Sequence, residues 1–142
     1  MADIKHSISI AAPAERVYPL IASVKGFRQW WAEDVTDNSN GTVELGFFNR
    51  ATVYRLAPVR MKASLVEWQC ETGQEWSSTS LIFELSAQGG NTLLCFTHAD
   101  WKSETEYFVS CNTVWGELMF RLKAAAEGKT PGPLFKTNAL AY

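Results

Sequence analysis

Residues 103–128, SETEYFVSCNTVWGELMFRLKAAAEG, form the longest amphipathic segment of the chain. Ser103 and Glu106 match the S-x-x-E pattern, in which two side chains pair with the free amides of a helix start. Apolar residues then recur at steps of three and four: Tyr107, Phe108, Cys111, Val114, Trp115, Leu118, Met119, Leu122 and Ala126. This spacing predicts a helix of about seven turns with one wide apolar face, ending at Gly128. The rest of the chain must cover that face.

The N-terminal residues predict a strand followed by helical pieces. Residues 3–10 alternate apolar and polar side chains, with Ile4, His6, Ile8 and Ile10 on one face, which is typical of a half-buried strand. A helix then opens at Ala12-Pro13, because proline suits the first helical position.

The helix after Pro13 contains a second proline, Pro19, which removes an interior hydrogen bond. We therefore expect a kink or a break into two short helices, with Gly26 as an end point and residues 27–31 as a further helical turn. Residues 33–41, EDVTDNSNG, are polar and rich in turn formers, which predicts a loop.

The middle of the chain predicts five consecutive strands with short connections. They are residues 42–48, 51–57, 61–70, 75–86 and 92–98. Short connections favour an antiparallel meander. Together with the first strand, this pattern predicts an α+β domain in which a six-stranded antiparallel sheet curls around the long C-terminal helix.

The length of 142 residues fits one domain, which we place at residues 1–128. We expect residues 129–142 to form a tail that packs on the domain or on a partner through Leu134, Phe135 and Leu140. The N-terminus lacks the basic start and apolar core of a signal peptide, and no apolar run approaches the roughly 18 residues of a membrane span. A cytoplasmic location is therefore expected.

Charge and motifs exclude several classes of function. A formal net charge of -2 gives no electrostatic reason to bind nucleic acid or an anionic membrane. Cys70, Cys95 and Cys111 are odd in number and far apart, which favours three reduced thiols over disulfides or a zinc site. His6 and His98 have no third ligand at useful spacing, and phosphate loops and G-x-S-x-G are absent. We predict neither a metal nor a cofactor.

His98 is the best candidate for chemistry, because Leu94, Phe96 and His98 share the inward face of the last strand. Three roles are open: it bonds a neighbouring group and holds the loop to the helix, it contacts a ligand, or it acts as an acid–base residue. Thr79 also faces the concave side, where it either orients a ligand or bonds a neighbouring strand.

Four segments together resemble a known family. They are SISIAAPAERVYPLIASVKGFRQWW (7–31), STSLIFELSAQGGNTLLCFTHADW (78–101), NTVWGELMFRLKAAAEG (112–128) and KTPG (129–132). The chain resembles the START-like or SRPBCC superfamily, with its helix-grip (Bet v-like) fold, and more closely the branch named after the activator of the heat-shock chaperone ATPase. The resemblance implies a deep cavity between sheet and C-terminal helix, used by relatives for apolar molecules and in a few cases for cyclase, hydrolase or dehydratase chemistry.

The chain is rich in aromatic residues, with six Trp, eight Phe and four Tyr, and such rings suit either an apolar ligand site or a filled core. We predict a small-molecule-binding protein for an apolar or aromatic ligand, without clear catalytic apparatus. The predicted ligand-binding residues are Trp31, Tyr54, Trp68, Phe83, Phe96, His98, Trp101, Phe108, Cys111 and Trp115. On the helix, Phe108, Cys111 and Trp115 are expected to face the pocket, with Leu118, Met119 and Leu122 closing the packed end.

Two alternatives to a binding protein stay open. The first is a cyclase- or hydrolase-type enzyme that uses His98 as its acid–base residue. The second is an interaction module, either a chaperone partner or a homodimer, which uses the tail and the outer face of the helix around Val109 and Phe120.

Overall fold

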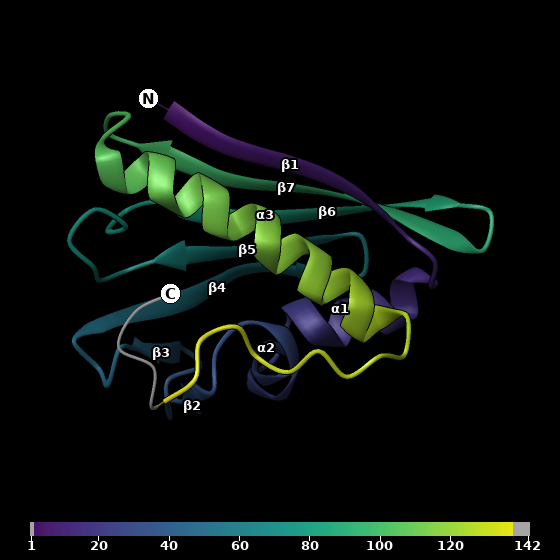
Figure 1. Ribbon diagram of the computed structural model, residues 1–142, viewed down its shortest axis with the longest axis horizontal. Helices are drawn as coiled ribbons and strands as arrows, with labels where there is room; N and C mark the ends of the chain where they lie inside the picture. Colours follow the sequence, from purple (N-terminus) through teal and green to yellow (C-terminus); the bar gives the residue numbers. More distant parts are fainter. Residues whose placement is uncertain (1, 138–142) are drawn as a thin grey trace.

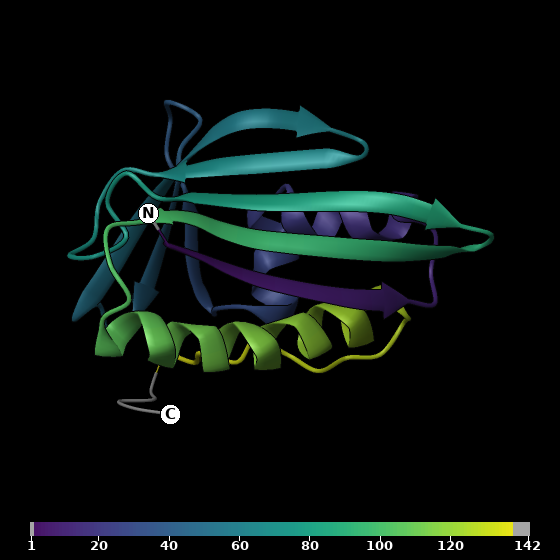
Figure 2. The ribbon, with the colours of Figure 1, turned by 90° about the horizontal axis from the view of Figure 1, so that it is seen from above.

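The computed structural model describes residues 2–137, which fold as a sheet wrapped around one long helix (Figures 1 and 2). Within these residues the elements, in chain order, are β1 (Ala2–Ile10), α1 (Ala14–Ile21), α2 (Val24–Trp30), β2 (Asp34–Asp37), β3 (Val43–Phe47), β4 (Thr52–Lys62), β5 (Leu65–Cys70), β6 (Ser80–Gln88), β7 (Asn91–Trp101) and α3 (Glu106–Ala126). Helix α3 crosses one face of the sheet, and α1 and α2 lie near its C-terminal end (Figure 1). The predicted α+β class is confirmed.

The sheet is antiparallel throughout and has the order β1-β7-β6-β5-β4-β3-β2. Its strands from β2 to β7 form the predicted meander, and β1 joins at the β7 edge, where Ile4 lies opposite His98. The prediction of six strands is wrong, because the described chain has seven. The additional strand is β2, which pairs with β3 from Asp34↔Gly46 to Asp37↔Val43. Its residues were predicted as loop, since only Val35 of the four is buried.

Strand β4 also differs from the prediction, because it continues through Pro58 to Lys62 instead of ending at Pro58. The pairing with β5 shifts register between Pro58 and Arg60. Proline is accommodated in sheets at such irregularities, where its missing amide leaves no ladder hydrogen bond unmade.

The predicted break after Pro19 is confirmed as two short helices. Ser23 separates them: its hydroxyl donates to the carbonyl of Pro19 at 2.8 Å and accepts from the amide of Gly26 at 3.0 Å. Gly26 therefore lies inside α2 and does not end α1, contrary to the prediction. A Cβ at Gly26 would lie 2.0 Å from the carbonyl oxygen of Pro19, so the two helices approach through this glycine.

Helix α3 buries the predicted face, but it begins at a different cap. Thr105, not Ser103, accepts from the amide of Phe108 at 3.2 Å, and its hydroxyl donates to Glu75 Oε1 at 2.5 Å. The side chains that α3 buries against the sheet are Phe108, Cys111, Trp115, Leu118, Met119, Leu122 and Ala126. In the described part of the chain, no helix has the length and apolar character needed to cross a membrane.

Candidate functional site

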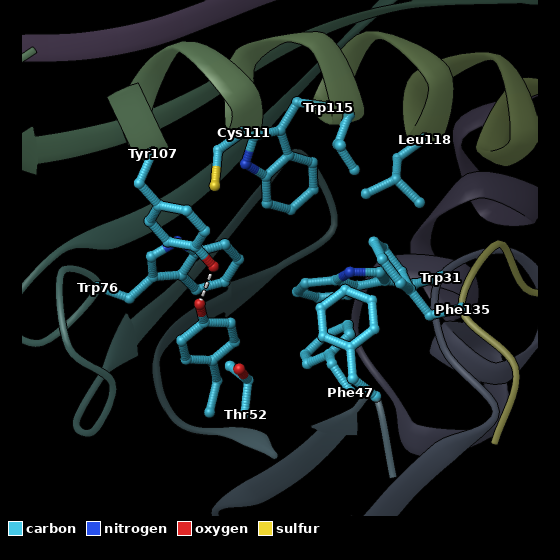
Figure 3. Close-up of a pocket in the computed structure, with 12 residues that line it drawn as sticks. Trp31, Phe47, Thr52, Trp76, Tyr107, Cys111, Trp115, Leu118 and Phe135 are labelled. Carbon is cyan, nitrogen blue, oxygen red and sulfur yellow. Dashed lines mark hydrogen bonds between the residues drawn. The ribbon is translucent and has the colours of Figure 1, made fainter. Parts of the chain in front are cut away.

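A small cavity lies between the N-terminal half of α3, the β3–β4 hairpin and Trp31 (Figure 3). Its volume is about 40 Å³, which is room for a few water molecules. The side chains that line it are Trp31, Phe47, Phe48, Thr52, Tyr54, Trp76, Tyr107, Cys111, Val114, Trp115, Leu118 and Phe135. Aromatic rings therefore make up most of its wall.

The polar part of the wall is a pair of tyrosines. The hydroxyls of Tyr54 and Tyr107 are hydrogen-bonded to each other, one from β4 and one from the first turn of α3 (Figure 3). The ring of Tyr54 stacks on Trp76, with centroids 3.9 Å apart and planes 4° from parallel. Burial and the bond to Tyr107 raise the pKa of Tyr54 far above its ordinary value, so this hydroxyl stays protonated as a hydrogen-bond donor.

Cys111 lies beside this pair and is the one thiol on the cavity wall among the described residues. Burial raises the pKa of Cys111, while the nearby Trp76 and Tyr107 side chains partly oppose that rise. A reactive cysteine needs a lowered pKa, so that the thiolate is present near neutral pH. The surroundings of Cys111 favour an uncharged thiol, which suits a binding wall better than a nucleophile.

His98 is fully buried and does not line the cavity. Its Nδ1 accepts from Trp115 Nε1 at 3.1 Å, and its Nε2 lies 2.9 Å from the Thr79 hydroxyl. Because an indole nitrogen can only donate, the proton of His98 must sit on Nε2 and point to Thr79. The Thr79 hydroxyl in turn donates to the carbonyl of Trp76 at 2.5 Å.

This chain of hydrogen bonds holds His98 as a neutral ring. Burial lowers the pKa of His98 to about 3, and a second ring proton would oppose the N–H of Trp115. The ring packs edge-on to Trp76, 4.6 Å between centroids. An acid–base residue must exchange protons with a ligand near its operating pH. The geometry therefore favours the first of the three roles, in which His98 joins the last strand to α3 and to the loop before β6.

Four of the predicted ligand-binding residues come together around the cavity: Trp31, Tyr54, Cys111 and Trp115. The other six are buried elsewhere in the core: Trp68, Phe83, Phe96, His98, Trp101 and Phe108. Trp68, for example, donates its indole N–H to the carbonyl of Ile21 at 2.9 Å and so ties β5 to the end of α1. Contact of these residues with a ligand remains a prediction.

The sequence reasoning missed most residues of the β3–β4 hairpin that reach the cavity. Phe47 and Phe48 are neighbours and both line it, although adjacent strand residues normally face opposite ways. The reason is backbone geometry, since Phe48 has a φ of 55° and leaves the extended conformation. Leu118 also lines the cavity, whereas it was expected at the packed end. The apolar face of α3 was the available signal for Tyr107 and Val114.

The remaining lining residue, Phe135, belongs to residues 129–137, which we call the C-terminal strap. The strap leaves α3 and runs back along the domain (Figure 2). It forms a parallel bridge with Ala32, where the Phe135 amide donates to the carbonyl of Trp31 at 3.0 Å and the Glu33 amide donates to the carbonyl of Phe135 at 2.8 Å. The predicted contact residue Leu140 lies outside the described residues.

Two side chains fasten the ends of the strap. Arg121 Nη1 of α3 donates to the carbonyls of Pro131 at 3.1 Å and Gly132 at 2.8 Å. Glu33 Oε1 accepts from the amide of Thr137 at 2.8 Å and from its hydroxyl at 3.1 Å. These bonds from Thr137 lower the pKa of Glu33. Over residues 2–137, no group of three or more His, Cys, Asp or Glu side chains is placed to hold a metal ion.

Neither a protein-family model nor a curated protein matches the sequence. Several solved structures are similar to this chain over most of its length. The Aha1 dimer from Colwellia psychrerythraea is 27% identical, with a TM-score of 0.79 over 90% of this chain and 98% of that one. CalU16 from Micromonospora echinospora is 18% identical, with a TM-score of 0.73 over 93% and 69%. A START superfamily protein from Mycobacterium smegmatis is 15% identical, with a TM-score of 0.63 over 90% and 96%.

These likenesses define the class of fold. The chain has the START-like (SRPBCC) helix-grip fold, and its similarity to the Aha1 structure extends over nearly its whole length. The expected resemblance is confirmed at the level of the fold. In this chain the space between sheet and helix is largely filled by aromatic side chains, where the resemblance implied a deep cavity.

Proposed function

We propose that this protein binds a small apolar or aromatic molecule between the sheet and α3. The observation that carries the proposal is the make-up of the cavity wall: eight aromatic side chains, with few polar groups, chiefly the Tyr54–Tyr107 hydroxyl pair and the hydroxyl of Thr52. Ligand sites of this kind combine mostly apolar lining with a few fixed polar groups. The fold supports the proposal, since it places this wall beneath a helix that spans the sheet.

The position of Cys111 allows a direct test of the site. Replacing Cys111 by Leu fills the cavity, because the added carbon atoms project from α3 into a space of about 40 Å³. We expect wild-type protein to bind neutral aromatic molecules in a panel measured by ligand-observed NMR and native mass spectrometry. Cys111→Leu should weaken binding by at least about tenfold, the effect of roughly 1.4 kcal/mol.

The matched control is Cys95→Leu, which makes the same change at a half-buried thiol of β7 that does not line the cavity. This variant should bind as the wild type does. Wild-type protein that binds nothing in the panel, or a Cys111→Leu variant that binds unchanged, would contradict the proposed site.

A second candidate function is self-association through the outer face of α3. Val109 and Phe120 are 58% and 67% exposed, and a separation of eleven residues places them on the same side of the helix, about three turns apart. A partner that covers this face of the helix would bury both side chains together. The similar Aha1 structure is itself a dimer.

Sedimentation velocity over a range of concentrations tests this second function. We expect a dimer whose dissociation constant rises at least about tenfold in Phe120→Glu, because the charge would be buried unpaired. Val59→Glu, at a 51% exposed apolar residue of β4, should leave the constant unchanged. A monomer at several hundred micromolar would rule the candidate out.

A further inference from the structure

The cavity is too small for the ligand that its wall suits. An apolar cavity of roughly 150 Å³ holds a benzene ring, whereas this one measures about 40 Å³. A side chain of the protein itself occupies the additional space that such a ligand would need. The benzyl side chain of Phe135 fills one side of the site, 9% exposed, with its ring edge-on to Phe47 at 4.9 Å and to Phe48 at 5.9 Å between centroids.

Phe135 is also the wall residue that can leave most easily. Helix α3 buries seven side chains and cannot move without exposing them. In the strap, Phe135 is the one buried residue among 129–137, and its neighbours are exposed or half-buried. Besides the backbone bonds that join Phe135 to Trp31 and Glu33 and the bonds from Arg121, the strap is held at its outer end by hydrogen bonds from Thr137 to the exposed carboxylate of Glu33. Segments with few buried contacts open at a low free energy.

The lining chemistry restricts what can take the place of Phe135. None of the described lining residues is charged, so a charged molecule would lose its hydration without compensation. Trp31, Phe47 and Trp115 bring flat aromatic surfaces to the site. The Tyr107 hydroxyl, which is hydrogen-bonded to that of Tyr54, lies across the cavity from Phe135 (Figure 3). A ring in the place of Phe135 would therefore direct a substituent toward that pair.

We propose that Phe135 is an internal stand-in for the ligand, and that a neutral single-ring aromatic molecule carrying an oxygen, of the phenol class, replaces it when the strap is released. This inference rests on the proposed function, because it names the ligand class and the entry step of the same site. Strap and ligand then compete. The apparent affinity for the ligand is then the affinity of the open site multiplied by the fraction of time that the site is open.

The test measures binding of p-cresol by titration calorimetry to wild type, Glu33→Ala and Glu71→Ala. Glu33→Ala removes the acceptor for Thr137 without touching the cavity wall. It should tighten p-cresol binding by about threefold to tenfold, the effect of losing hydrogen bonds of ordinary strength from the closed state. Glu71→Ala removes an equally exposed carboxylate that pairs with Arg55 and should have no effect.

A second variant and a second readout guard against misfolding. Phe135→Ala should bind p-cresol more tightly still, since it removes the competing ring itself. Saturating p-cresol should also speed tryptic cleavage at Lys136 in wild type, because a bound ligand keeps the strap released. Cleavage that slows when p-cresol binds would contradict the proposal.

The outcomes separate this inference from the proposed function. Binding of p-cresol that is unchanged or weakened in both Glu33→Ala and Phe135→Ala overturns the competition while leaving the site a ligand site. Binding by none of the variants, with other apolar molecules retained by wild type, overturns the ligand class alone. Toluene that binds as tightly as p-cresol would show that the hydroxyl pair does not recognise the oxygen.

Discussion

At the scale of single residues, the hydrogen bonds of His98 show how a titratable group can be fixed in one state. The indole of Trp115 requires a bare Nδ1, and the Thr79 hydroxyl, which is committed to the carbonyl of Trp76, receives the proton on Nε2. Three segments, the loop before β6, β7 and α3, are joined through one ring. A histidine in this position contributes to stability only while it is uncharged.

The stability of the protein should therefore fall as the pH drops below the ordinary histidine range. The pKa of His98 is lowered from 6.5 to about 3 on folding, so between these values the unfolded chain binds the extra proton. In that window, His98 should lower the free energy of unfolding by about 1.4 kcal/mol for each unit by which the pH falls. Urea denaturation at pH 7.5, 6 and 5 measures the decline.

Two variants isolate the contribution of His98. His98→Leu should be less stable at pH 7.5, because it leaves the Trp115 N–H without an acceptor, and it should be less sensitive to acid, by about 2 kcal/mol at pH 5 relative to wild type. Thr79→Val loses the hydrogen bond but keeps the ring, so it should retain the acid sensitivity. Parallel pH profiles for wild type and His98→Leu would refute this account.

At the scale of elements, periodicity predicted those segments whose own side chains decide their structure. The long face of α3 and the alternation of β1 are examples, since burial of one face specifies both. Strand β2 was missed because an edge strand of four residues with one buried side chain, Val35, owes its conformation to the neighbouring β3. One buried position in four residues is too short a pattern to show the alternation of a half-buried strand.

The cavity was predicted less completely than the fold, for a geometric reason. Cys111 and Trp115 follow from the apolar face of α3, and Trp31 and Tyr54 were proposed as members of the aromatic set; all four line the cavity. Phe48 reaches the cavity through a left-handed backbone at φ 55°, and Phe135 through a strap with no periodicity of its own. Neither conformation is encoded by residue spacing, so neither side chain could be placed from the sequence.

The junction of α1 and α2 depends on the absence of a side chain at Gly26. A Cβ there would meet Pro19 O at 2.0 Å and Leu20 Cα at 2.6 Å, both backbone atoms that cannot rotate away. We expect Gly26→Ala to lower the unfolding free energy by about 3 kcal/mol, the upper part of the range for overpacked sites. Chemical denaturation gives the value.

Gly90→Ala serves as the matched control for that substitution. Nothing lies within 4 Å of a Cβ at Gly90, in the β6–β7 turn. This variant should lie within about 0.5 kcal/mol of wild type. Equal effects at the two glycines would show that the helix junction tolerates a methyl group.

At the scale of the whole molecule, the three thiols report on how different parts of the domain open. Cys95 is half-buried, while Cys70 is buried in β5 and Cys111 is buried in α3, on the wall of the cavity. Burial raises the pKa of Cys70 to about 12. This thiol is therefore shielded from reagents and is also kept in its uncharged, less reactive form. Local openings of different size should expose Cys70 and Cys111 at different rates.

Alkylation by iodoacetamide, followed by peptide mass spectrometry, should modify Cys95 first, then Cys111 and last Cys70. Urea below the unfolding midpoint should raise the alkylation rate of Cys70 most. Cys70 lies in the middle of the sheet, so its thiol becomes accessible only when the domain unfolds globally. Glu33→Ala should raise the alkylation rate of Cys111 and leave the alkylation rate of Cys70 unchanged. Identical rates for the two buried thiols in native protein would mean that the domain opens only as one unit.

The pairing of β1 with β7 has a consequence for how the protein is made. Ile4 pairs with His98, and the same strand packs beneath α3, so β1 can complete its contacts only after β7 and α3 have been synthesised. Contacts of such sequence separation are slow to form. On the ribosome, the meander from β2 to β7 can assemble while the N-terminal strand stays unpaired. The apolar face of that strand then stays uncovered until α3 has emerged from the ribosome.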